Sequence, residues 1–247
     1  WMVSVSFMST GEAAVFPPPL LPRTWTLDHY RELFVTQGMG RYLWNSFALA
    51  SMATALALAF TVPAGYAFAK LAFRGRDRVF QLLVAALVVP AQIGTLPLFL
   101  MLKQMGLVNT YAGALVPWLA SIFGLFLVRQ YALSIPDEML EAARIDGASE
   151  GQIFRRVVLP TLQPIVVTLA LFVFLGSWND FLWPLIILTD QSNYTLPVAL
   201  AALSREHVQD IEMMMAGAVI TVAPVLILFL ALQRYYIRGM LAGSVKG

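Results

Sequence analysis

Hydrophobic positions along the chain form long runs rather than the spaced stripe of a soluble amphipathic helix. Five runs reach the roughly 20 residues that an α-helix needs to cross a hydrocarbon core about 30 Å thick. The predicted spans cover residues 45–69, 79–102, 111–128, 165–188 and 213–232. Charged residues are nearly absent from them, with Asp180 as the exception. The pattern predicts an all-α fold, a polytopic transmembrane helical bundle.

Prolines and glycines fall inside several of these runs. Pro63 and Gly65 are expected to interrupt the first span, and Pro90 and Pro97 are expected to kink the second for packing reasons. Such residues are tolerated in a bilayer where neighbouring helices satisfy the freed carbonyls. We therefore expect packed helices rather than isolated ones.

Composition agrees with the hydropathy pattern and argues against several classes of function. The chain is 59% hydrophobic and 12% charged, against roughly 25% charged residues in soluble domains. A formal charge of +2 is too small to argue for nucleic acid, and cysteine is absent. His29 and His207 are too far apart in the sequence to form a ligand motif, and no paired carboxylates or nucleophile elbow are present. These observations argue against a membrane enzyme and against a metal site.

Basic residues set the expected orientation, because loops rich in Lys and Arg stay on the cytoplasmic side. Eleven of the 16 basic residues lie in the loops near residues 70–78 and 129–156 and after residue 233. These loops are predicted to be cytoplasmic, and so is the C-terminus. Residues 1–44 are then outside, although residues 1–7 are too short to span a membrane. We expect six spans in the complete protein, with the first largely missing here; a cleaved signal peptide is the alternative.

Residues 135–160 form the only sizeable polar segment on the predicted cytoplasmic side. Pro136 fits the first position of a helix, and Gly147 fits its left-handed cap. Ser149 and Gln152 fit a capping box for a second short helix, which is expected to stop before Pro160. Glu141 with Arg144, and Asp146 near Arg155, are expected to place paired charges around an alanine-rich patch. The residues alone allow a cytoplasmic helix pair or a solvated loop equally.

A resemblance to a known family decides between these readings. Residues 136–149 (PDEMLEAARIDGAS) and VxLP at 157–160 resemble the signature loop of binding-protein-dependent ABC importer permeases. Further strings resemble the carbohydrate-uptake branch related to the maltose-type inner-membrane permease: YLWNS at 42–46, GYAFA at 65–69, WNDF at 178–181, YTLP at 194–197 and LAGSVKG at 241–247. A match at so many positions is far more specific than a lone glycine motif.

The resemblance implies that the cytoplasmic segment is a coupling helix pair that docks on a separate ATPase. The implied coupling residues are Glu141, Ala142, Ala143, Asp146, Gly147 and Ala148. The implied ATPase contacts of the tail are Gly243, Ser244, Val245 and Lys246. The sequence contains no Gly-Lys pair and so no phosphate-cradling loop. We expect the chain to be a translocation subunit rather than an enzyme and to hold no cofactor, with ATP and Mg bound by the partner.

On this basis the chain is expected to be one ABC-importer transmembrane domain over 1–247. It would comprise the end of a first span and an external segment (1–44), spans (45–134), the cytoplasmic coupling loop (135–160), spans with an external loop (161–237) and a cytoplasmic tail (238–247). Its expected partners are a second permease subunit in a heterodimer, an ATPase dimer, an extracytoplasmic binding protein and membrane lipid. The expected location is the inner membrane of a prokaryote.

Candidate residues for the cargo are few. Trp178, Asn179 and Asp180 lie in the fourth span, where a carboxylate is costly and often functional. Capping or tying of helices explains Asp180 equally well, and an interfacial aromatic belt could explain Trp178.

The external loop carries the expected binding-protein contacts, which are Asn193, Tyr194, Thr195 and Leu196. The expected cargo is a sugar or related polyol, carried by alternating access. An ion-coupled secondary transporter is the alternative, although it usually has midplane ionisable residues and internal repeats.

Overall fold

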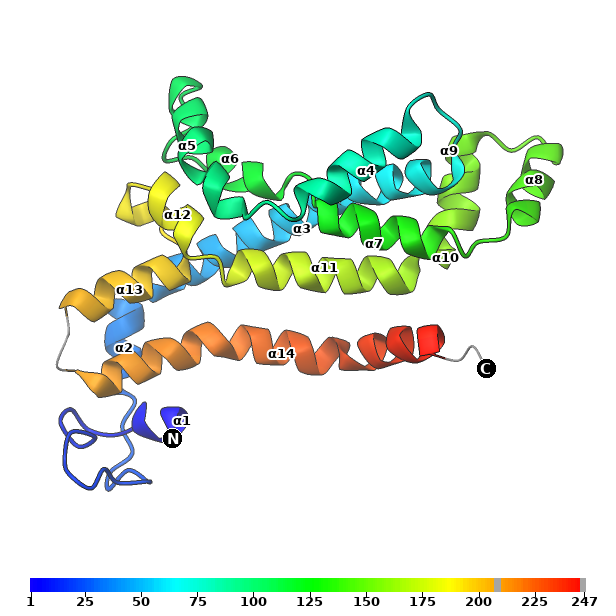
Figure 1. Cartoon of the computed structure of the whole chain (residues 1–247). Coiled ribbons are helices and arrows are strands. Elements are labelled where there is room, and N and C mark those ends of the chain that lie inside the picture. The colour runs from blue at the N-terminus through cyan, green and yellow to red at the C-terminus, as the bar shows by residue number, and fades with distance from the viewer. Residues whose placement is uncertain (207–209, 245–247) are drawn as a thin grey trace. The chain divides into compact units, whose positions relative to one another are not determined.

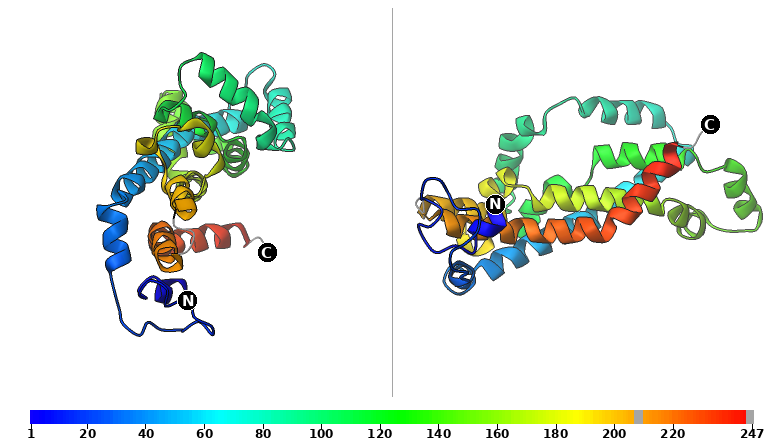
Figure 2. Two further views of the ribbon diagram at one scale, coloured as in Figure 1. Left: turned by 90° about the vertical axis from the view of Figure 1, so that its left-hand side faces the viewer. Right: turned by 90° about the horizontal axis from the view of Figure 1, so that it is seen from below.

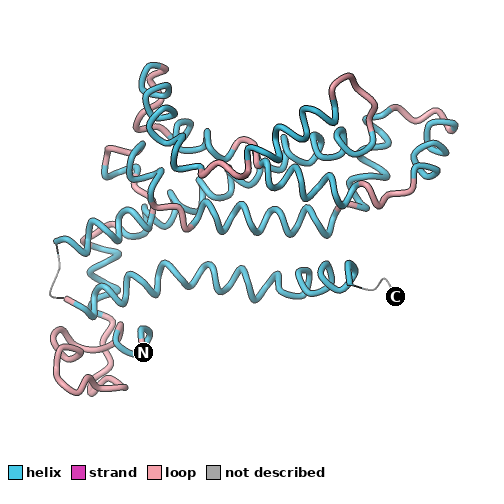
Figure 3. Tube along the Cα trace, in the orientation of Figure 1, coloured by secondary structure: helices cyan, strands magenta, loops and turns pink. Residues whose placement is uncertain are grey.

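The computed structural model describes residues 1–206 and 210–244, and gives only the backbone of residues 205–206 and 231–244. Within these ranges the chain consists of helices and loops, without a β-strand (Figures 1 and 3). The all-α prediction is confirmed.

The helices have the following bounds. Up to residue 118 they are α1 Met2–Val5, α2 Asp28–Val35, α3 Met39–Lys70, α4 Arg76–Ala86, η1 Ala91–Gly94, α5 Thr95–Gln104, α6 Tyr111–Leu115 and η2 Val116–Trp118. The next group is α7 Ile122–Ala132, α8 Asp137–Ile145, α9 Glu150–Ile153, the π-helical turn η3 Phe154–Val158 and α10 Leu159–Thr161. The last group is α11 Gln163–Trp178, α12 Leu182–Ile187, η4 Gln191–Asn193, α13 Leu196–Glu206 and α14 Ile211–Ser244.

Among the described residues, two helical stretches are long and apolar enough to cross a membrane alone. They are α3, with 32 residues, and Ile211–Leu230 of α14. Three bent pairs also reach that length: Arg76–Ala86 with Ala91–Gln104 at 94°, Tyr111–Trp118 with Ile122–Ala132 at 44°, and Glu150–Thr161 with Gln163–Trp178 at 77°. The total of up to five matches the predicted number of spans.

The fourth predicted span, 165–188, is wrong in its extent. Helix α11 ends at Trp178, and a separate short helix, α12, begins at Leu182. Asp180 explains this restart, because its Oδ1 accepts a hydrogen bond from the backbone N–H of Trp183 at 3.4 Å. A carboxylate that satisfies a free N–H at a helix start favours a new helix over continuation of the old one.

The first predicted span is longer and more regular than expected. Helix α3 continues without a break through Pro63 and Gly65. Gly65 serves close packing instead, since a Cβ atom there would lie 2.6 Å from Cγ1 of Val128 on α7.

The packing divides the chain into two compact units. The first contains residues 1–49, 102–114 and 178–231, and the second contains residues 50–101, 115–177 and 232–247. In the second unit, α7 lies beside α4 and α11 (Figures 1 and 2). It packs on α4 through stacked Phe80 and Phe126 rings, 6.4 Å apart, and on α11 through edge-to-face Phe123 and Phe172 rings, 6.3 Å apart. The candidate coupling segment follows α7 directly.

Candidate functional site

Residues 135–161 form a helical hairpin at the end of α7. Ile135 is buried and Pro136 is extended, so α8 begins at Asp137 rather than at the proline. Asp137 and Glu138 occupy the first turn and Arg144 the last, which complements the helix dipole at both ends. Leu140 anchors the inner face of α8 at 1% exposure. The predicted helix pair is present.

Gly147 ends α8 in the predicted left-handed conformation, with φ of +80°. The N–H of Gly147 donates to the carbonyl of Arg144, and the N–H of Ala148 donates to the carbonyl of Ala143, both at 3.0 Å. These two bonds make a Schellman motif, which a glycine adopts without steric cost. A Cβ atom at Gly147 would have no neighbour within 4 Å, so the surface of this turn is open in the described part of the chain.

The predicted capping box begins the second helix. The N–H of Ser149 donates to Oε1 of Gln152 at 2.8 Å, and the serine side chain accepts from the N3 backbone in return. The predicted stop before Pro160 is wrong, because a π-helical turn over Phe154–Val158 leads into α10 Leu159–Thr161. The proline is accommodated within the first turn of α10, where its missing N–H costs little. The chain turns only at Leu162.

A chain of polar contacts links this hairpin to α3. Arg144 Nε donates to Glu150 Oε1 at 2.7 Å, and the hydroxyl of the buried Tyr66 donates to Glu150 Oε2 at 3.3 Å. The Arg144–Glu150 hydrogen bond raises the pKa of the Arg144 guanidinium above its usual range. The structure thus gives Arg144 a hydrogen-bonded partner that differs from the predicted Glu141, and Glu150 and Tyr66 were missed from the sequence.

Lys70, the last residue of α3, fixes the other end of the hairpin. Its Nζ donates to the carbonyl of Ile135 at 2.6 Å and to Asp137 Oδ1 at 2.8 Å. The lysine side chain is 6% exposed, whereas that of Asp137 is 71% exposed. Helix α3 therefore contacts the start of α8 through Lys70 and the start of α9 through Tyr66.

The predicted coupling residues lie on the outward side of this hairpin. Glu141, Ala142, Asp146 and Gly147 are exposed, and Ala143 and Ala148 are half-buried. Two apolar side chains of α8 are also exposed, Met139 at 46% and Ile145 at 87% of their surface. The result is a narrow, small-residue surface with acidic groups, held from behind by α3.

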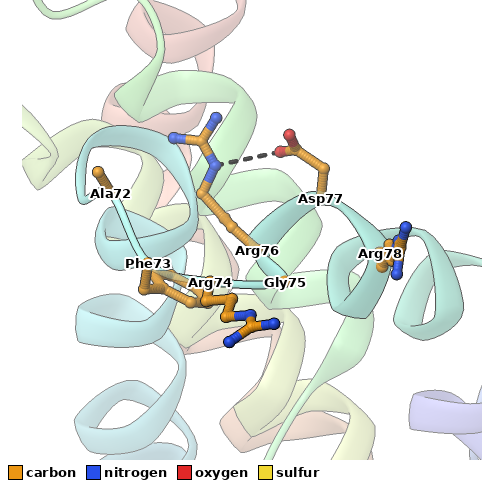
Figure 4. A pocket seen from close by; sticks show the side chains of 7 residues that line it. All are labelled: Ala72, Phe73, Arg74, Gly75, Arg76, Asp77 and Arg78. Carbon is orange, nitrogen blue, oxygen red and sulfur yellow. Dashed lines mark hydrogen bonds and ion pairs between the residues drawn. The ribbon is translucent and has the colours of Figure 1, made fainter.

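A basic loop joins α3 to α4 in the same unit. A hollow of about 920 Å³ is lined by residues 72–78, which include Arg74, Arg76 and Arg78 (Figure 4). Arg76 pairs with the neighbouring Asp77 at 3.1 Å. Gly75 turns this loop with φ of +85°, in a position as open as that of Gly147.

The predicted binding-protein contacts lie in the first unit on a tightly anchored segment. Asn45 Nδ2 donates to the carbonyls of Ser192 and Tyr194 at 3.0 and 2.9 Å. The N–H of Leu196 donates to Ser46 Oγ at 2.7 Å. The two strings YLWNS and YTLP, far apart in the sequence, are thus in direct contact.

The individual side chains of this segment differ in exposure. Thr195 and Leu196 are buried at 3% and 0%, whereas Asn193 and Tyr194 are half-buried. Asn193 also donates through Nδ2 to the carbonyl of Asn109 at 3.3 Å. Of the predicted set, Asn193 and Tyr194 are therefore the residues whose side chains are accessible to a binding protein.

The predicted cargo-facing group is enclosed only in part, because Asn179 is exposed and Asp180 is half-buried. Trp178 is 1% exposed, and its indole Nε1 donates to the carbonyl of Thr221 at 3.2 Å. Trp183 is 7% exposed and donates to the carbonyl of Gly113. These indoles tie neighbouring helices, and Asp180 caps α12. Of the predicted tail contacts, Val245 and Lys246 lie outside the described residues, and only the backbone of Gly243 and Ser244 is described.

Comparison with known proteins agrees with this architecture. Residues 61–242 match the family model described as binding-protein-dependent transport system inner membrane component. The arabinooligosaccharides transport system permease protein AraQ of Halalkalibacterium halodurans is 38% identical over 246 residues, covering 99% of this chain and 86% of that protein. The osmoprotective compounds uptake permease protein GgtD of Synechocystis is 37% identical, covering 97% and 81%.

The fold is also found among solved structures. A chain of a bacterial ABC transporter involved in the import of the acidic polysaccharide alginate superposes with a TM-score of 0.85, at 25% identity, over 96% of this chain and 89% of that one. The chain is thus a multi-pass permease of the inner membrane, and it belongs to the binding-protein-dependent transport system inner membrane component family. The ion-coupled alternative receives no support from these relatives.

Proposed function

We propose that this permease translocates a sugar or related polyol, and that its α8–α9 hairpin docks on a separate ATPase. The hairpin carries the second part of the proposal, because Glu141, Ala142 and Gly147 present an exposed small-residue surface that α3 supports from behind. The cargo class is supported by AraQ, whose name refers to arabinooligosaccharides.

The partners follow from the same proposal. ATP and Mg are bound by the ATPase dimer, since this chain has no Gly-Lys pair and, within its described residues, no cluster of three His, Cys, Asp or Glu side chains suited to a metal. A second, different permease completes the path. The binding protein contacts the outer segment that includes Asn193 and Tyr194. The C-terminus is cytoplasmic, and the tail 243–246 contacts the ATPase.

In the proposed cycle, the hairpin transmits motion of the ATPase to the membrane helices. Closure of the ATPase dimer displaces α8 and α9, and the displacement reaches α3 through Lys70 and through the Tyr66–Glu150 contact. Rigid helix ends transmit such a motion better than a frayed loop, and both ends of this hairpin turn are capped. The membrane cavity then opens alternately to each side.

The energy source is tested in proteoliposomes that contain the permease pair, the ATPase and the binding protein. We expect uptake of at least one member of a labelled panel of arabinotriose, lactose, maltose and glycerol with internal ATP alone. An imposed proton or sodium gradient without ATP is expected to drive no uptake. Uptake driven by the gradient alone, or of no panel member while ATP is hydrolysed, contradicts the proposal.

The docking role is tested by Gly147→Ala, with Gly75→Ala as the matched control. Both glycines have positive φ and open space around a new Cβ atom, so each substitution costs about 1 kcal/mol of backbone strain. We expect Gly147→Ala to lower ATP-driven uptake about tenfold or more, because the methyl group enters the proposed contact, while Gly75→Ala retains uptake. Equal uptake by the two variants would contradict the docking role of this turn.

A further inference from the structure

Helices α4 and α7 are two half-length helices of the same extent. Each contains 11 residues, which corresponds to about 16 Å, or half of a hydrocarbon core. They pack on each other through Phe80 and Phe126, and the Arg129 guanidinium lies 4.0 Å from the centroid of the Phe80 ring. A break in a bent helix pair follows α4 and another precedes α7. Each break lies at the end of its helix that is away from the basic loop and the hairpin. The two breaks are therefore expected at similar depth, near the middle of the membrane.

The breaks have clear local causes. In the first pair, Pro90 is extended, with ψ of 127°, and it separates α4 from η1. In the second pair, Ser121 is extended and its side chain accepts from the N–H of Gly124 at 2.9 Å, which starts α7. Irregular backbone within the hydrocarbon region is tolerated only where protein covers it or water reaches it. Both breaks must therefore face a partner or an aqueous space.

One cavity of about 790 Å³ adjoins both breaks. Its described lining includes Pro90 and Gln92 from the first and Trp118, Ser121 and Phe123 from the second. This volume is in the range of small-molecule sites, which are mostly apolar with a few polar groups. The hollow is open to the surface on the side of Pro90 and Gln92, which are exposed, and its lining comes from two separate helix breaks.

The lining chemistry favours a neutral ligand over an ion. No charged side chain occurs among its described residues. The Gln92 side chain is exposed and makes no hydrogen bond within the described part of the chain, so its amide can both donate and accept. Trp118 is half-buried, because the edge of its six-membered ring lies over Gly176, where a Cβ atom would be 2.9 Å from Cη2. An amide beside an indole suits the hydroxyl groups and the C–H face of a sugar ring.

We propose that this cavity is where the translocated carbohydrate contacts this subunit, with Gln92 binding hydroxyl groups and Trp118 contacting the ring. The proposal rests on the proposed function and adds the location of the path. It transfers the cargo-contacting role from Trp178 and Asp180, which tie and cap helices, to residues at the two helix breaks.

The chain contains no cysteine, which allows a direct test in the assembled importer. Gln92→Cys lines the cavity, whereas Ile93→Cys occupies the adjacent position, which is 67% exposed and outside the cavity lining. The probe is 2-(trimethylammonium)ethyl methanethiosulfonate, which requires water and an ionised thiol. We expect the Gln92→Cys variant to react roughly tenfold faster than the Ile93→Cys variant, at a rate that differs between the nucleotide-free and ATP–vanadate states. The panel sugar that the wild-type importer takes up should slow labelling of the Gln92→Cys variant.

Transport kinetics give a second readout. Gln92→Ala is expected to raise the KM for uptake of that sugar about three- to tenfold, the effect of losing one or two hydrogen bonds, while the complex assembles normally. Equal labelling of the two cysteine variants in both states, or an unchanged KM, overturns the cavity assignment while wild-type uptake stands. If the Gln92→Cys variant is protected from the methanethiosulfonate reagent in every state, the partner permease occupies the cavity, and the cavity assignment is likewise overturned. Failure of the wild-type importer with every panel member instead contradicts the proposed function.

Discussion

At the residue scale, Gly65 illustrates why a small side chain matters where two membrane helices meet. A Cβ atom there would lie 2.6 and 2.7 Å from two side-chain atoms of Val128 and 3.2 Å from the backbone nitrogen of Arg129. The backbone cannot move away without disturbing α7, whose Arg129 also donates to the carbonyl of Phe68 at 3.3 Å. Close approach through small residues is a common way for membrane helices to associate.

Gly65→Ala is therefore expected to destabilise the permease by about 1–3 kcal/mol through overpacking. Gly151→Ala is the matched control, because Gly151 lies in helix α9 and a Cβ atom there meets nothing within 4 Å. That control is expected to be neutral or to stabilise by up to about 1 kcal/mol, since alanine favours a helix. Thermal unfolding of the detergent-solubilised complex measures both, and similar midpoints for the two variants would contradict the packing argument.

At the element scale, the position of α8 depends on the two contacts of Lys70. The carboxylate of Asp137 is exposed, so that ion pair is screened by solvent. The carbonyl of Ile135 belongs to a buried residue, and losing its hydrogen bond leaves a polar group poorly satisfied. The neutral carbonyl thus matters more than the opposite charge for holding α8.

Lys70→Met is expected to lower ATP-driven uptake more than Asp137→Asn does, roughly several-fold against less than twofold. The ATPase activity of the complex should persist in both variants, so the ratio of uptake to ATP hydrolysis is the measurement. A larger loss in Asp137→Asn would show instead that the ion pair controls the position of α8.

The elements that the sequence predicted correctly are those with a local cause. The Gly147 turn and the Ser149–Gln152 box depend on neighbours within five residues, and both are present. The break at Ser121 was missed because hydropathy continues through it, whereas the break after Trp178 was missed although the polar Asn179 and Asp180 mark it. The Tyr66–Glu150 contact was missed because 84 residues separate its members. Such contacts depend on how helices pack, which periodicity does not encode.

At the scale of the whole molecule, the chain is a multi-pass permease whose polar segments are expected to alternate between the two sides of the membrane. The loop 72–78 and the hairpin 135–161 carry six of the 16 basic residues, whereas the segment 189–196 around Gln191 carries none. The bias of Lys and Arg toward the cytoplasmic side orients all the spans together.

Single cysteines can check this orientation in intact cells. Arg74→Cys and Gln191→Cys are both at exposed positions. A membrane-impermeant maleimide is expected to label the Gln191→Cys variant in intact cells and the Arg74→Cys variant only after permeabilisation. The reverse pattern would invert the topology and place the hairpin outside, away from any ATPase.

The exposed Ile145 on α8 has a consequence for how firmly the ATPase stays attached at high ionic strength. At 87% exposure it contributes almost its whole apolar surface to water in the isolated chain. Covering such a side chain contributes about 2 kcal/mol, and this gain is not screened by ions. A complex held partly in this way resists high ionic strength, which strips proteins attached by surface charges alone. Washing membranes with concentrated salt should therefore leave the ATPase attached.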